Sequence, residues 1–441
     1  MIVDVTEATL AGIRNPLLRA YAGQYVHIYQ DFMAQVQQMG VEVEDHDDTA
    51  EVRARIAALG EKGALARNDG KSVYVNRISP ACQACQLAVG SHTFFVSLKC
   101  HRSCFFCFNP NQEEYDFHRE HARDLSAELD ALRDSGQPVQ HLALTGGEPL
   151  LFKPETIDFF RRARQDFPQV FTRLYTSGDH LERETLQAFK DAGVNEIRIS
   201  IRLEDSKNAR RHTFEQIALA REYIPNVMVE MPVLPGTLDE MKAVLTELDR
   251  LGVFGINLLE FCFPYHNAVI YRRRGYRVKA RPFRVLYNYW YAGGLPVAGS
   301  ETECMELVEF ALEEKLTLGV HYCSLENKHT GQVYQQNMAH PGDLNTLCFS
   351  QRDYFLKSAK VFGPDAAQAS RVLNRGELRA QPSFENQPQL EFHVNQVRKL
   401  RKLDIELGIA TYVLEVRGGE TFLRELKVDV TTPQEFRLAD I

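Results

Sequence analysis

Residues 93–108 read TFFVSLKCHRSCFFCF, and this stretch decides how the rest of the chain is interpreted. An apolar run ends at Leu98, and Cys100, Cys104 and Cys107 follow it with C-x3-C-x2-C spacing. Three thiolates at this spacing can hold three irons of a 4Fe–4S cluster. The fourth iron would have no ligand from this stretch and would be open to a small molecule. A zinc site or three separate buried thiols are the alternative interpretations of the same cysteines.

A second motif follows the next predicted strand. Residues 140–145 (QHLALT) are typical of a strand, and Gly146, Gly147, Glu148 and Pro149 come directly after it. Glycines allow backbone conformations and a close approach of a ligand that side chains would prevent. The Glu148 carboxylate can accept a hydrogen bond from an ammonium group. An ordinary strand-to-helix turn is the alternative interpretation of this motif when it is taken alone.

Together, the two motifs resemble the radical S-adenosylmethionine (SAM) superfamily. That family places the cysteine triplet just after the first strand of a partial α/β barrel, with an aromatic residue before the last cysteine, where this chain has Phe106. The resemblance implies that the triplet holds a 4Fe–4S cluster, that SAM chelates the open iron, and that the Gly-Gly-Glu-Pro segment binds the amino group of SAM. It implies reductive cleavage of SAM to a 5′-deoxyadenosyl radical, which abstracts hydrogen from a substrate. It also implies an external electron donor such as flavodoxin or ferredoxin.

Strands and helices alternate through the middle of the chain. Period-two or apolar runs predict strands near residues 93–98, 140–145, 170–175, 196–202, 226–231 and 255–261, with helical patterns between them. Repeated strand–helix units predict a parallel sheet with right-handed crossovers. The fold class expected is therefore α/β, a partial (β/α)6 barrel with a helical N-terminal extension and a small α+β C-terminal region.

Polar residues at the predicted strand ends are further candidates, because active sites of parallel barrels lie at the C-terminal ends of their strands. Ser177 follows the third strand, in a region that contacts SAM in the family resembled. Ser200 and Arg202 on the fourth strand are placed to meet the ribose or the carboxylate of SAM. A barrel-interior hydroxyl and a surface ion pair are the respective alternatives. Glu230 lies near the end of the fifth strand, where the strand turns into a loop, and could bind substrate or form a salt bridge with Arg202, since buried acids need a partner.

The remaining cysteines suggest a second metal site. Cys82 and Cys85 form a C-x2-C pair before the first strand, and Cys323 and Cys348 lie in segments that read as loops. We expect these four thiols to bind an auxiliary iron–sulfur cluster, with zinc as the alternative. The histidine beside Cys323, His321, could replace one thiolate.

Composition is consistent with a globular enzyme. The chain has 441 residues, 44% hydrophobic residues and a formal net charge of −8, which gives no general support for nucleic-acid binding. No apolar run approaches the roughly 20 residues that span a bilayer. The N-terminus lacks the basic-then-apolar pattern of a signal peptide. Nine cysteines, several of them clustered, favour metal binding over disulfides in a reducing compartment, so a cytoplasmic location is expected.

We expect three segments and a chain-like substrate. The segments are a helical extension over 1–75, the barrel over 76–325 with an aromatic and basic insertion at 263–300, and a C-terminal region over 326–441. Because the large flanks could embrace a polypeptide, modification of a peptide or protein is the leading hypothesis. A glycyl-radical-enzyme activase, a small-molecule isomerase or methyltransferase, and a non-catalytic iron–sulfur or zinc sensor are the alternatives. No catalytic side chain is assigned; the candidates for quenching the substrate radical are Cys323, Tyr271 and Tyr322.

Overall fold

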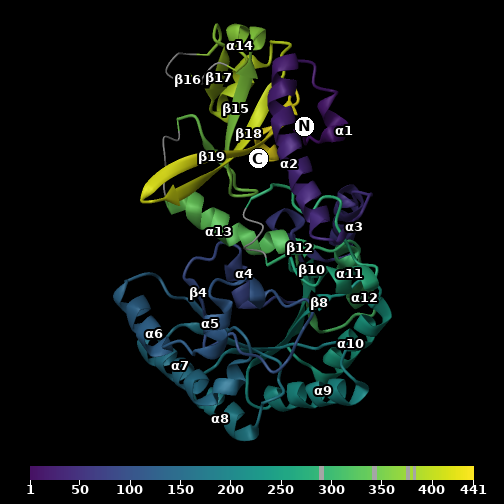
Figure 1. Cartoon of the computed structure of the whole chain (residues 1–441), viewed down its shortest axis with the longest axis vertical. Coiled ribbons are helices and arrows are strands. Elements are labelled where there is room, and N and C mark those ends of the chain that lie inside the picture. The colour runs from purple at the N-terminus through teal and green to yellow at the C-terminus, as the bar shows by residue number, and fades with distance from the viewer. Residues whose placement is uncertain (288–292, 340–344, 374–377, 381–383) are drawn as a thin grey trace. The chain divides into compact units, whose positions relative to one another are not determined.

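The computed structural model describes the chain from Met1 to Ile441 except residues 288–292, 340–344, 374–377 and 381–383 (Figure 1). The chain divides into two compact units. The barrel unit comprises Met39–Pro282 and, after the short segment that begins at Phe283, the described residues 293–331. The terminal unit comprises Met1–Gln38, a short segment that begins at Phe283, and Gln332–Ile441. The division into three segments at residues 75 and 325 stays a prediction.

The barrel unit is built on one sheet, whose described strands lie in the order β2-β3-β13-β9-β8-β7-β6-β5-β4. Neighbouring strands from β4 to β13 are parallel, and β3 and β2 continue the sheet in antiparallel pairing. The strands are β2 (Leu65–Arg67), β3 (Ser72–Val75), β4 (Ser91–Phe95), β5 (His141–Thr145), β6 (Phe171–Thr176), β7 (Glu196–Ile199), β8 (Asn226–Val233), β9 (Gly255–Glu260) and β13 (Gly319–Cys323). The predicted partial α/β barrel is confirmed, and β2, β3 and β13 are strands that the sequence analysis did not predict.

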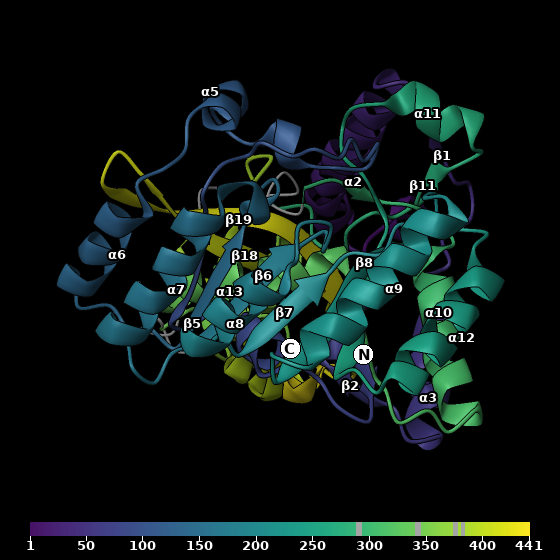
Figure 2. The ribbon, with the colours of Figure 1, turned by 90° about the horizontal axis from the view of Figure 1, so that it is seen from below.

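Apolar side chains on the outer face of these strands pack against helices. Ile197 and Ile199 on β7 are fully buried in this core, together with Leu186 and Phe189, which share one face of α8. Figure 2 shows the helices from α6 to α10, and α12, outside the strands. The helices of the barrel unit are α3 (Thr49–Glu61), α4 (Pro80–Cys85), α5 (Tyr115–Glu120), α6 (Leu125–Asp134), α7 (Lys153–Asp166), α8 (Arg183–Asp191), α9 (Lys207–Arg221), α10 (Leu238–Leu251), α11 (Ala268–Arg273), α12 (Ser300–Glu313) and the start of α13 (Leu325–Ala339).

The inner face of the same sheet is polar, because successive side chains of a strand point to opposite faces. Glu196 and Arg198 alternate with the apolar residues of β7, and both are buried. Helix α4 lies against this inner face, since Arg198 Nη2 donates to Cys82 Sγ at 3.2 Å. The interior of the barrel unit is therefore suited to polar groups rather than to hydrocarbon.

Short elements connect the strands at their ends. The 3-10 turns are η1 (Asn68–Gly70), η2 (Asn109–Asn111) and η3 (Pro149–Phe152). Two small strand pairs lie outside the main sheet: β1 (Glu42–Val43) with β11 (Arg277–Val278), and β10 (Cys262–Phe263) with β12 (Leu295–Pro296). The described part of the predicted insertion at 263–300 thus contains short strands and α11, and residues 288–292 lie outside the described residues.

The terminal unit is an antiparallel sheet packed against an N-terminal helix. Its described strands lie in the order β16-β17-β15-β18-β19, with β14 also paired to β15. Leu18 and Ala22 of the long helix α2 are fully buried against the sheet residues Ala410 and Val428. The elements are α1 (Glu7–Leu10), α2 (Pro16–Gln38), β14 (Cys348–Phe349), β15 (Leu356–Phe362), α14 (Pro364–Ala369), β16 (Leu378–Ala380), β17 (Gln389–Phe392), η6 (Val394–Leu400), β18 (Leu407–Arg417), β19 (Glu420–Thr431) and η7 (Leu438–Asp440).

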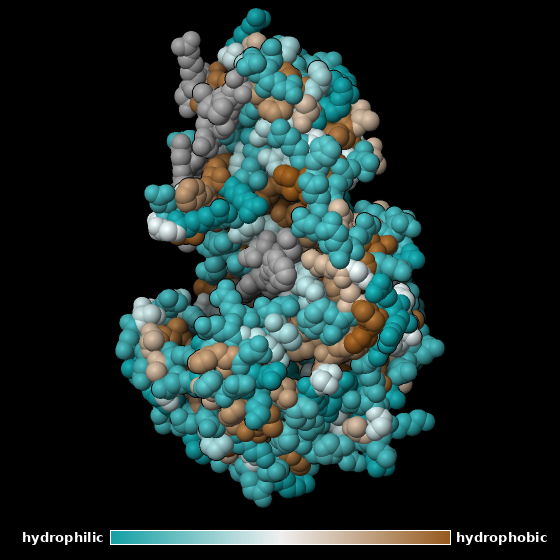
Figure 3. Space-filling view, in the orientation of Figure 1, coloured by the Kyte–Doolittle hydropathy of each residue, from teal (hydrophilic) through white to brown (hydrophobic). Residues whose placement is uncertain are grey.

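The face drawn in Figure 3 is mostly hydrophilic, with apolar residues in small separate groups. Among the residues that the structure describes, none of the helices has the length and apolar character needed to cross a membrane.

Candidate active site

The cysteine triplet lies on one loop that leaves the C-terminal end of β4 and reaches α5. Cys100 is exposed, and Cys104 and Cys107 are half-buried. Burial raises the pKa of the Cys104 thiol to about 11, and the neighbouring Cys107 and Cys100 act in the same direction, so the three sulfurs lie near one another. The backbone N–H of Arg102 donates to Cys100 Sγ at 3.5 Å. Three thiols on one loop and an N–H directed at sulfur fit the ligand set of a 4Fe–4S cluster.

Side-chain amides and a histidine fix the cysteine loop to its surroundings. Asn109 Nδ2 donates to the Gly146 carbonyl at 2.7 Å, and Asn267 Nδ2 donates to the Phe105 carbonyl at 2.9 Å. The Nε2 of His266 lies 2.9 Å from the Cys107 carbonyl oxygen. The ring of Phe106 packs edge-on against Phe105 and Phe261, with ring centroids 5.1 and 5.9 Å apart. The loop is therefore held from both sides, and contact of Phe106 with a cofactor stays a prediction.

The Gly-Gly-Glu-Pro segment lies directly against the chain that precedes Cys100. The backbone N–H of Gly147 donates to the Ser97 carbonyl at 2.9 Å, and that of Glu148 donates to the Lys99 carbonyl at 2.8 Å. A Cβ on Gly147 would lie 2.0 Å from the Lys99 oxygen, and one on Gly146, whose φ is +111°, would lie 2.6 Å from the Ser97 oxygen. The glycines thus make room for the backbone of the cysteine loop, whereas the sequence analysis had assigned that room to a ligand.

Alanine at Gly147 should displace the cysteine loop, because the new methyl group would overlap the Lys99 carbonyl. We expect Gly147→Ala to lower the free energy of unfolding by about 1–3 kcal/mol and to reduce the iron bound after anaerobic reconstitution. The matched control is Gly60→Ala, because a Cβ on this α3 glycine meets nothing within 4 Å. That variant should unfold no more easily than the wild type, since alanine favours a helix over glycine. Equal iron content in the two variants would contradict the inference that Gly147 keeps the cysteine loop in place for cluster binding.

Glu148 is buried and already accepts several hydrogen bonds from its own chain. Its exposed fraction is 2%, and its carboxylate accepts from Thr176 Oγ1 at 2.6 Å, from the Ser177 N–H at 2.7 Å and from the Leu150 N–H at 3.1 Å. An ionised carboxylate has about four acceptor sites, so about one is left for an ammonium group. Ser177 is half-buried beside it, and Pro149 is buried at the start of η3. These contacts connect the end of β6 to the Gly-Gly-Glu-Pro segment.

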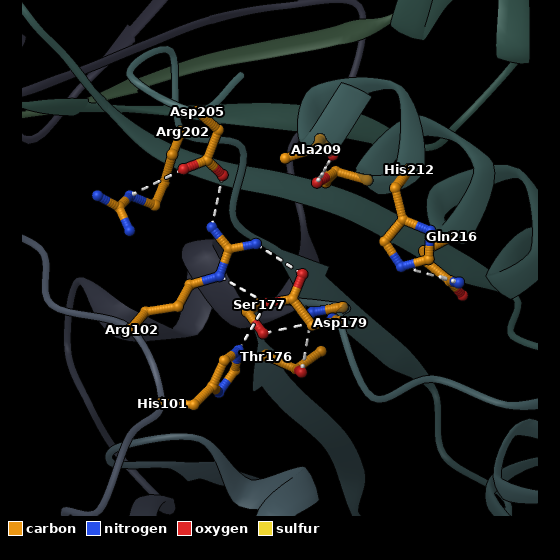
Figure 4. Close-up of polar contacts among 12 residues, drawn as sticks. His101, Arg102, Thr176, Ser177, Asp179, Arg202, Asp205, Ala209, His212 and Gln216 are labelled. Atoms are coloured by element: carbon orange, nitrogen blue, oxygen red, sulfur yellow. Dashed lines mark hydrogen bonds and ion pairs between the residues drawn. The ribbon is translucent and has the colours of Figure 1, made fainter. Parts of the chain in front are cut away.

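An arginine within the cysteine triplet joins the ends of two further strands (Figure 4). Arg102 donates twice to Asp179, at 2.6 Å from Nε and from Nη2, and once to Asp205, at 2.6 Å from Nη1. His101 Nε2 also lies 2.6 Å from Asp179. Burial acts to raise the pKa of Asp179, but the hydrogen bonds from Arg102 and His101 outweigh it and hold that pKa well below its usual range. The carboxylate is therefore ionised at neutral pH and pins the loop.

Sequence reasoning missed these residues. Asp179 comes two residues after Ser177, and Asp205 comes three after Arg202, so both follow strands whose C-terminal ends share one edge of the sheet. That position is the signal that could have identified them. Their positive partner, Arg102, lies between Cys100 and Cys104, in a motif whose pattern indicates a role only for the thiols.

Replacement of Arg102 by lysine should loosen the cysteine loop although the positive charge at this position is kept. An ammonium group cannot reproduce the bidentate contact of a guanidinium with a carboxylate. Outer partners of metal ligands typically contribute 10–100-fold to metal affinity or activity, so we expect SAM cleavage by Arg102→Lys to fall at least about tenfold. The matched control is Arg250→Lys, which alters an exposed arginine that donates to Glu247 at 2.7 and 2.6 Å. The assay is 5′-deoxyadenosine formation under reducing, anaerobic conditions. Equal rates for the two variants would show that the Arg102 contacts have no role in positioning the loop.

Ser200 and Arg202 lie beyond the end of β7, which stops at Ile199 rather than at the predicted residue 202. Ser200 is exposed, and its N–H donates to the Thr176 carbonyl at 3.1 Å, so it is not an interior hydroxyl. Arg202 Nη2 lies 3.8 Å from Glu204 and its Nε 3.8 Å from Asp205. Its buried Nε has no hydrogen-bond partner, and its positive charge acts to lower the pKa of Cys104 against the effect of burial. Arg202 therefore faces the cysteine loop, and its contact with SAM stays a prediction.

Glu230 pairs with a different arginine from the one considered in the sequence analysis. Arg198 Nη1 donates to Glu230 at 2.5 Å, and Asn257 Nδ2 donates to the same oxygen at 2.8 Å. Arg198 Nε also donates to Glu196 at 2.7 Å. The predicted partner Arg202 is wrong, because Arg202 lies past the strand end whereas Arg198 shares the inner face of the sheet with Glu230.

The structure brings three of the four thiols predicted for a second metal site into the barrel unit. Cys82 and Cys85 lie on α4, and Cys323 ends β13. Burial raises the pKa of Cys323 to about 12, and Cys85 and Cys82 act in the same direction. Cys348 begins β14 in the terminal unit. The prediction that Cys323 and Cys348 lie in loops is wrong, and their shared ligation of a cluster stays untested.

No group of three or more His, Cys, Asp or Glu side chains in the described ranges is arranged to hold a metal ion as it stands. The ligands of a single zinc ion converge on one point at about 2.3 Å. Each corner of a 4Fe–4S cluster takes its own thiolate, so the ligands of a cluster do not converge in that way.

Of the candidates for quenching a substrate radical, Tyr271 and Tyr322 are fully buried. The Tyr271 hydroxyl donates to the Cys262 carbonyl at 2.6 Å, and the Tyr322 hydroxyl donates to Glu301 at 2.8 Å. These contacts give both tyrosines a structural role, and no contact assigns either of them to the reaction.

Comparison with known proteins agrees with this geometry. Residues 95–248 match the family model described as the Radical SAM superfamily. A "Putative glycyl-radical enzyme activating enzyme MJ0021" from Methanocaldococcus jannaschii is 23% identical over 317 residues, which cover 69% of this chain and 79% of that protein. A PqqA peptide cyclase from Methylocella silvestris is 26% identical over 151 residues, covering 32% of this chain and 36% of that protein.

Solved structures are similar to this chain at lower sequence identity than these two relatives. SuiB of Streptococcus suis, bound to the precursor peptide SuiA, aligns with a TM-score of 0.34 and 12% identity over 54% of this chain. The methyltransferase TsrM of Kitasatospora setae aligns with a TM-score of 0.34 and 17% identity over 44% of this chain. The chain spans about half or less of these two structures, with coverage of 53% and 39%. The family match includes the cysteine triplet and the Gly-Gly-Glu-Pro segment, and residues 95–248 of the chain thus form a radical SAM domain.

Proposed function

We propose that this radical SAM enzyme abstracts hydrogen from a polypeptide substrate. In this proposal Cys100, Cys104 and Cys107 hold the 4Fe–4S cluster, and residues 146–149 bind the amino group of SAM. When bound, such a cluster supplies the electron that cleaves SAM to a 5′-deoxyadenosyl radical. An external protein such as a flavodoxin or ferredoxin would deliver that electron.

The contact of the Gly-Gly-Glu-Pro segment with the cysteine loop supports the SAM-cleaving part of this proposal. The two hydrogen bonds from Gly147 and Glu148 to the carbonyls of Ser97 and Lys99 hold the predicted SAM site next to the predicted cluster site. SAM must contact both at once, so their fixed separation is a requirement of the reaction. The carboxylate of Glu148 would take the amino group with its remaining acceptor site. Arg202 and Ser177, beside the same loop, would orient the rest of SAM.

The substrate class is supported by the names of two relatives. One is named as a cyclase of the peptide PqqA, and the other as an activating enzyme of a glycyl-radical enzyme. Both names denote a polypeptide as the molecule acted on. The longer of the two matches, which covers 79% of the relative, favours activation of a glycyl-radical enzyme as the second candidate function.

Fractionated cell extract can test the substrate class. We expect the macromolecular fraction to stimulate 5′-deoxyadenosine formation by the reconstituted enzyme, because it contains the substrate. Protease treatment of that fraction should remove the stimulation. A persistent protein radical, detected by electron paramagnetic resonance in the undigested macromolecular fraction after reaction with the enzyme, would favour the activase. Its absence would favour a modified peptide. Stimulation by the small-molecule fraction alone would contradict a polypeptide substrate.

A further inference from the structure

The thiols of α4 and β13 lie near one another in the barrel unit. Cys82 and Cys85 are three residues apart on α4 and therefore share one face of the helix. Cys323 is buried at the end of β13, within electrostatic range of both. The backbone of α4 is also close to α13, since a Cβ on Gly331 would lie 2.8 Å from the Cys85 carbonyl oxygen. Three thiols from two separate elements are thus enclosed on the inner face of the sheet.

A histidine on the same strand presents an unpaired nitrogen to this interior. His321 lies two residues before Cys323 on β13, so both side chains point to the same face. Its Nε2 lies 2.8 Å from Ser72 Oγ, whereas its Nδ1 is buried without a hydrogen-bond partner, and the residue is only 2% exposed. A buried nitrogen without a partner is unfavourable. A histidine that ligates a metal has this arrangement, with one ring nitrogen hydrogen-bonded and the other free to bind.

Hydrogen-bond donors surround the same thiols. Arg198 Nη2 donates to Cys82 Sγ at 3.2 Å, and Asn327 Nδ2 donates to Cys323 Sγ at 3.3 Å. Asn327 is held in turn by Asn68, whose Nδ2 donates to Asn327 Oδ1 at 2.7 Å. Donors to sulfur stabilise negative charge on thiolates and tune a cluster bound to them. A guanidinium and an oriented amide are therefore placed to hydrogen-bond the thiolates of a bound cluster.

We propose that Cys82, Cys85, Cys323 and His321 bind an auxiliary iron–sulfur cluster inside the barrel unit. His321 takes the place that the sequence analysis gave to Cys348, which belongs to β14 of the terminal unit. The site draws on α4 and β13 alone and uses none of the triplet cysteines. It is therefore independent of the proposed substrate and can be tested in a protein that has lost the SAM-cleaving cluster.

The test begins with the full chain carrying Cys100→Ala, Cys104→Ala and Cys107→Ala. After anaerobic reconstitution with iron and sulfide, this triple variant should retain about four irons and four sulfides per chain and a visible charge-transfer absorption. Adding Cys82→Ala with Cys85→Ala should remove both. A triple variant without iron would overturn the proposal. One equivalent of bound zinc in place of iron and sulfide would overturn the assignment of an iron–sulfur cluster to this site.

The fourth ligand is tested by substitutions in the same triple variant. We expect His321→Ala to lower the iron content severalfold and to alter the electron paramagnetic resonance spectrum of the reduced protein. His321→Cys should restore the iron, which separates ligation from a role in folding. Cys348→Ala should leave the iron unchanged, as should Cys304→Ala, which alters a fully buried core cysteine on α12. Loss of iron in Cys348→Ala with retention in His321→Ala would overturn the assignment of His321.

Discussion

Replacement of Cys104 by alanine should abolish the formation of 5′-deoxyadenosine from SAM. Cys104 is the middle thiol of the triplet, half-buried between Cys100 and Cys107 and facing Arg202. In the proposed cluster site, its loss removes one of the three thiolate ligands, and the loop contains no further thiol that could take its place. We expect iron content to fall and 5′-deoxyadenosine to drop to the level of a reaction without enzyme. Both are measured anaerobically with a strong reductant.

The control for this prediction is the same substitution at a thiol that has no place in the loop. Cys304 is fully buried on α12 in the apolar core of the barrel unit, so Cys304→Ala should keep the cluster and the activity while lowering stability slightly. Undiminished 5′-deoxyadenosine formation by Cys104→Ala would contradict the assignment of the triplet. Loss of activity in both variants would point to general unfolding, which circular dichroism would reveal.

The parts of the fold that were predictable have a clear local signal. The parallel strands β4 to β9 carry apolar side chains on the outer face, and each is followed by a helix with one apolar face, so periodicity identified them. The strand β13 has the same alternation, with Val320 and Tyr322 outward and His321 and Cys323 inward. It was read as a loop because its inward residues are polar, and sequence alone does not reveal that the inner face of this barrel is polar.

The error over Glu230 has a similar cause. Arg198 and Arg202 are an even number of residues apart, so both would point to the inner face if the strand continued. The choice between them depends on where β7 ends, and it ends at Ile199. The chain beyond this strand end makes contacts with distant residues, since Asp205 accepts a hydrogen bond from Arg102 in the cysteine loop. Such contacts leave no trace in the local pattern.

Replacement of Arg198 by methionine should be the most destabilising single change in the barrel unit. Arg198 is 3% exposed and donates to Glu196, which is fully buried, and to Glu230. Methionine fills a similar volume but leaves the buried carboxylate of Glu196 and the partly buried carboxylate of Glu230 without their positive partner. Breaking a buried ion pair from one side costs about 3–5 kcal/mol, so we expect a fall of that size in the free energy of unfolding, measured by chemical denaturation.

The pH dependence of that variant distinguishes lost charge from lost packing. In the wild type, burial acts to raise the pKa of Glu230, but Arg198 and Asn257 outweigh it and lower that pKa below its usual range. A lowered native pKa adds stability above the unfolded value of about 4.3 and loses it as the pH falls through the native pKa. Without Arg198, burial should raise the native pKa above the unfolded one. The penalty is then relieved on protonation, so Arg198→Met should gain stability as the pH falls from about 7 toward 5.

Arg183→Met is the matched control, because Arg183 forms an exposed pair with Glu222 in which the two side chains are 64% and 58% exposed. Exposed pairs contribute little to stability, so this variant should unfold like the wild type at every pH tested. If the stability of Arg198→Met changes with pH as the wild type does, the loss reflects packing and the carboxylates were not held by Arg198. An opposite slope in the variant would show that the polar interior depends on this one guanidinium, which also donates to Cys82.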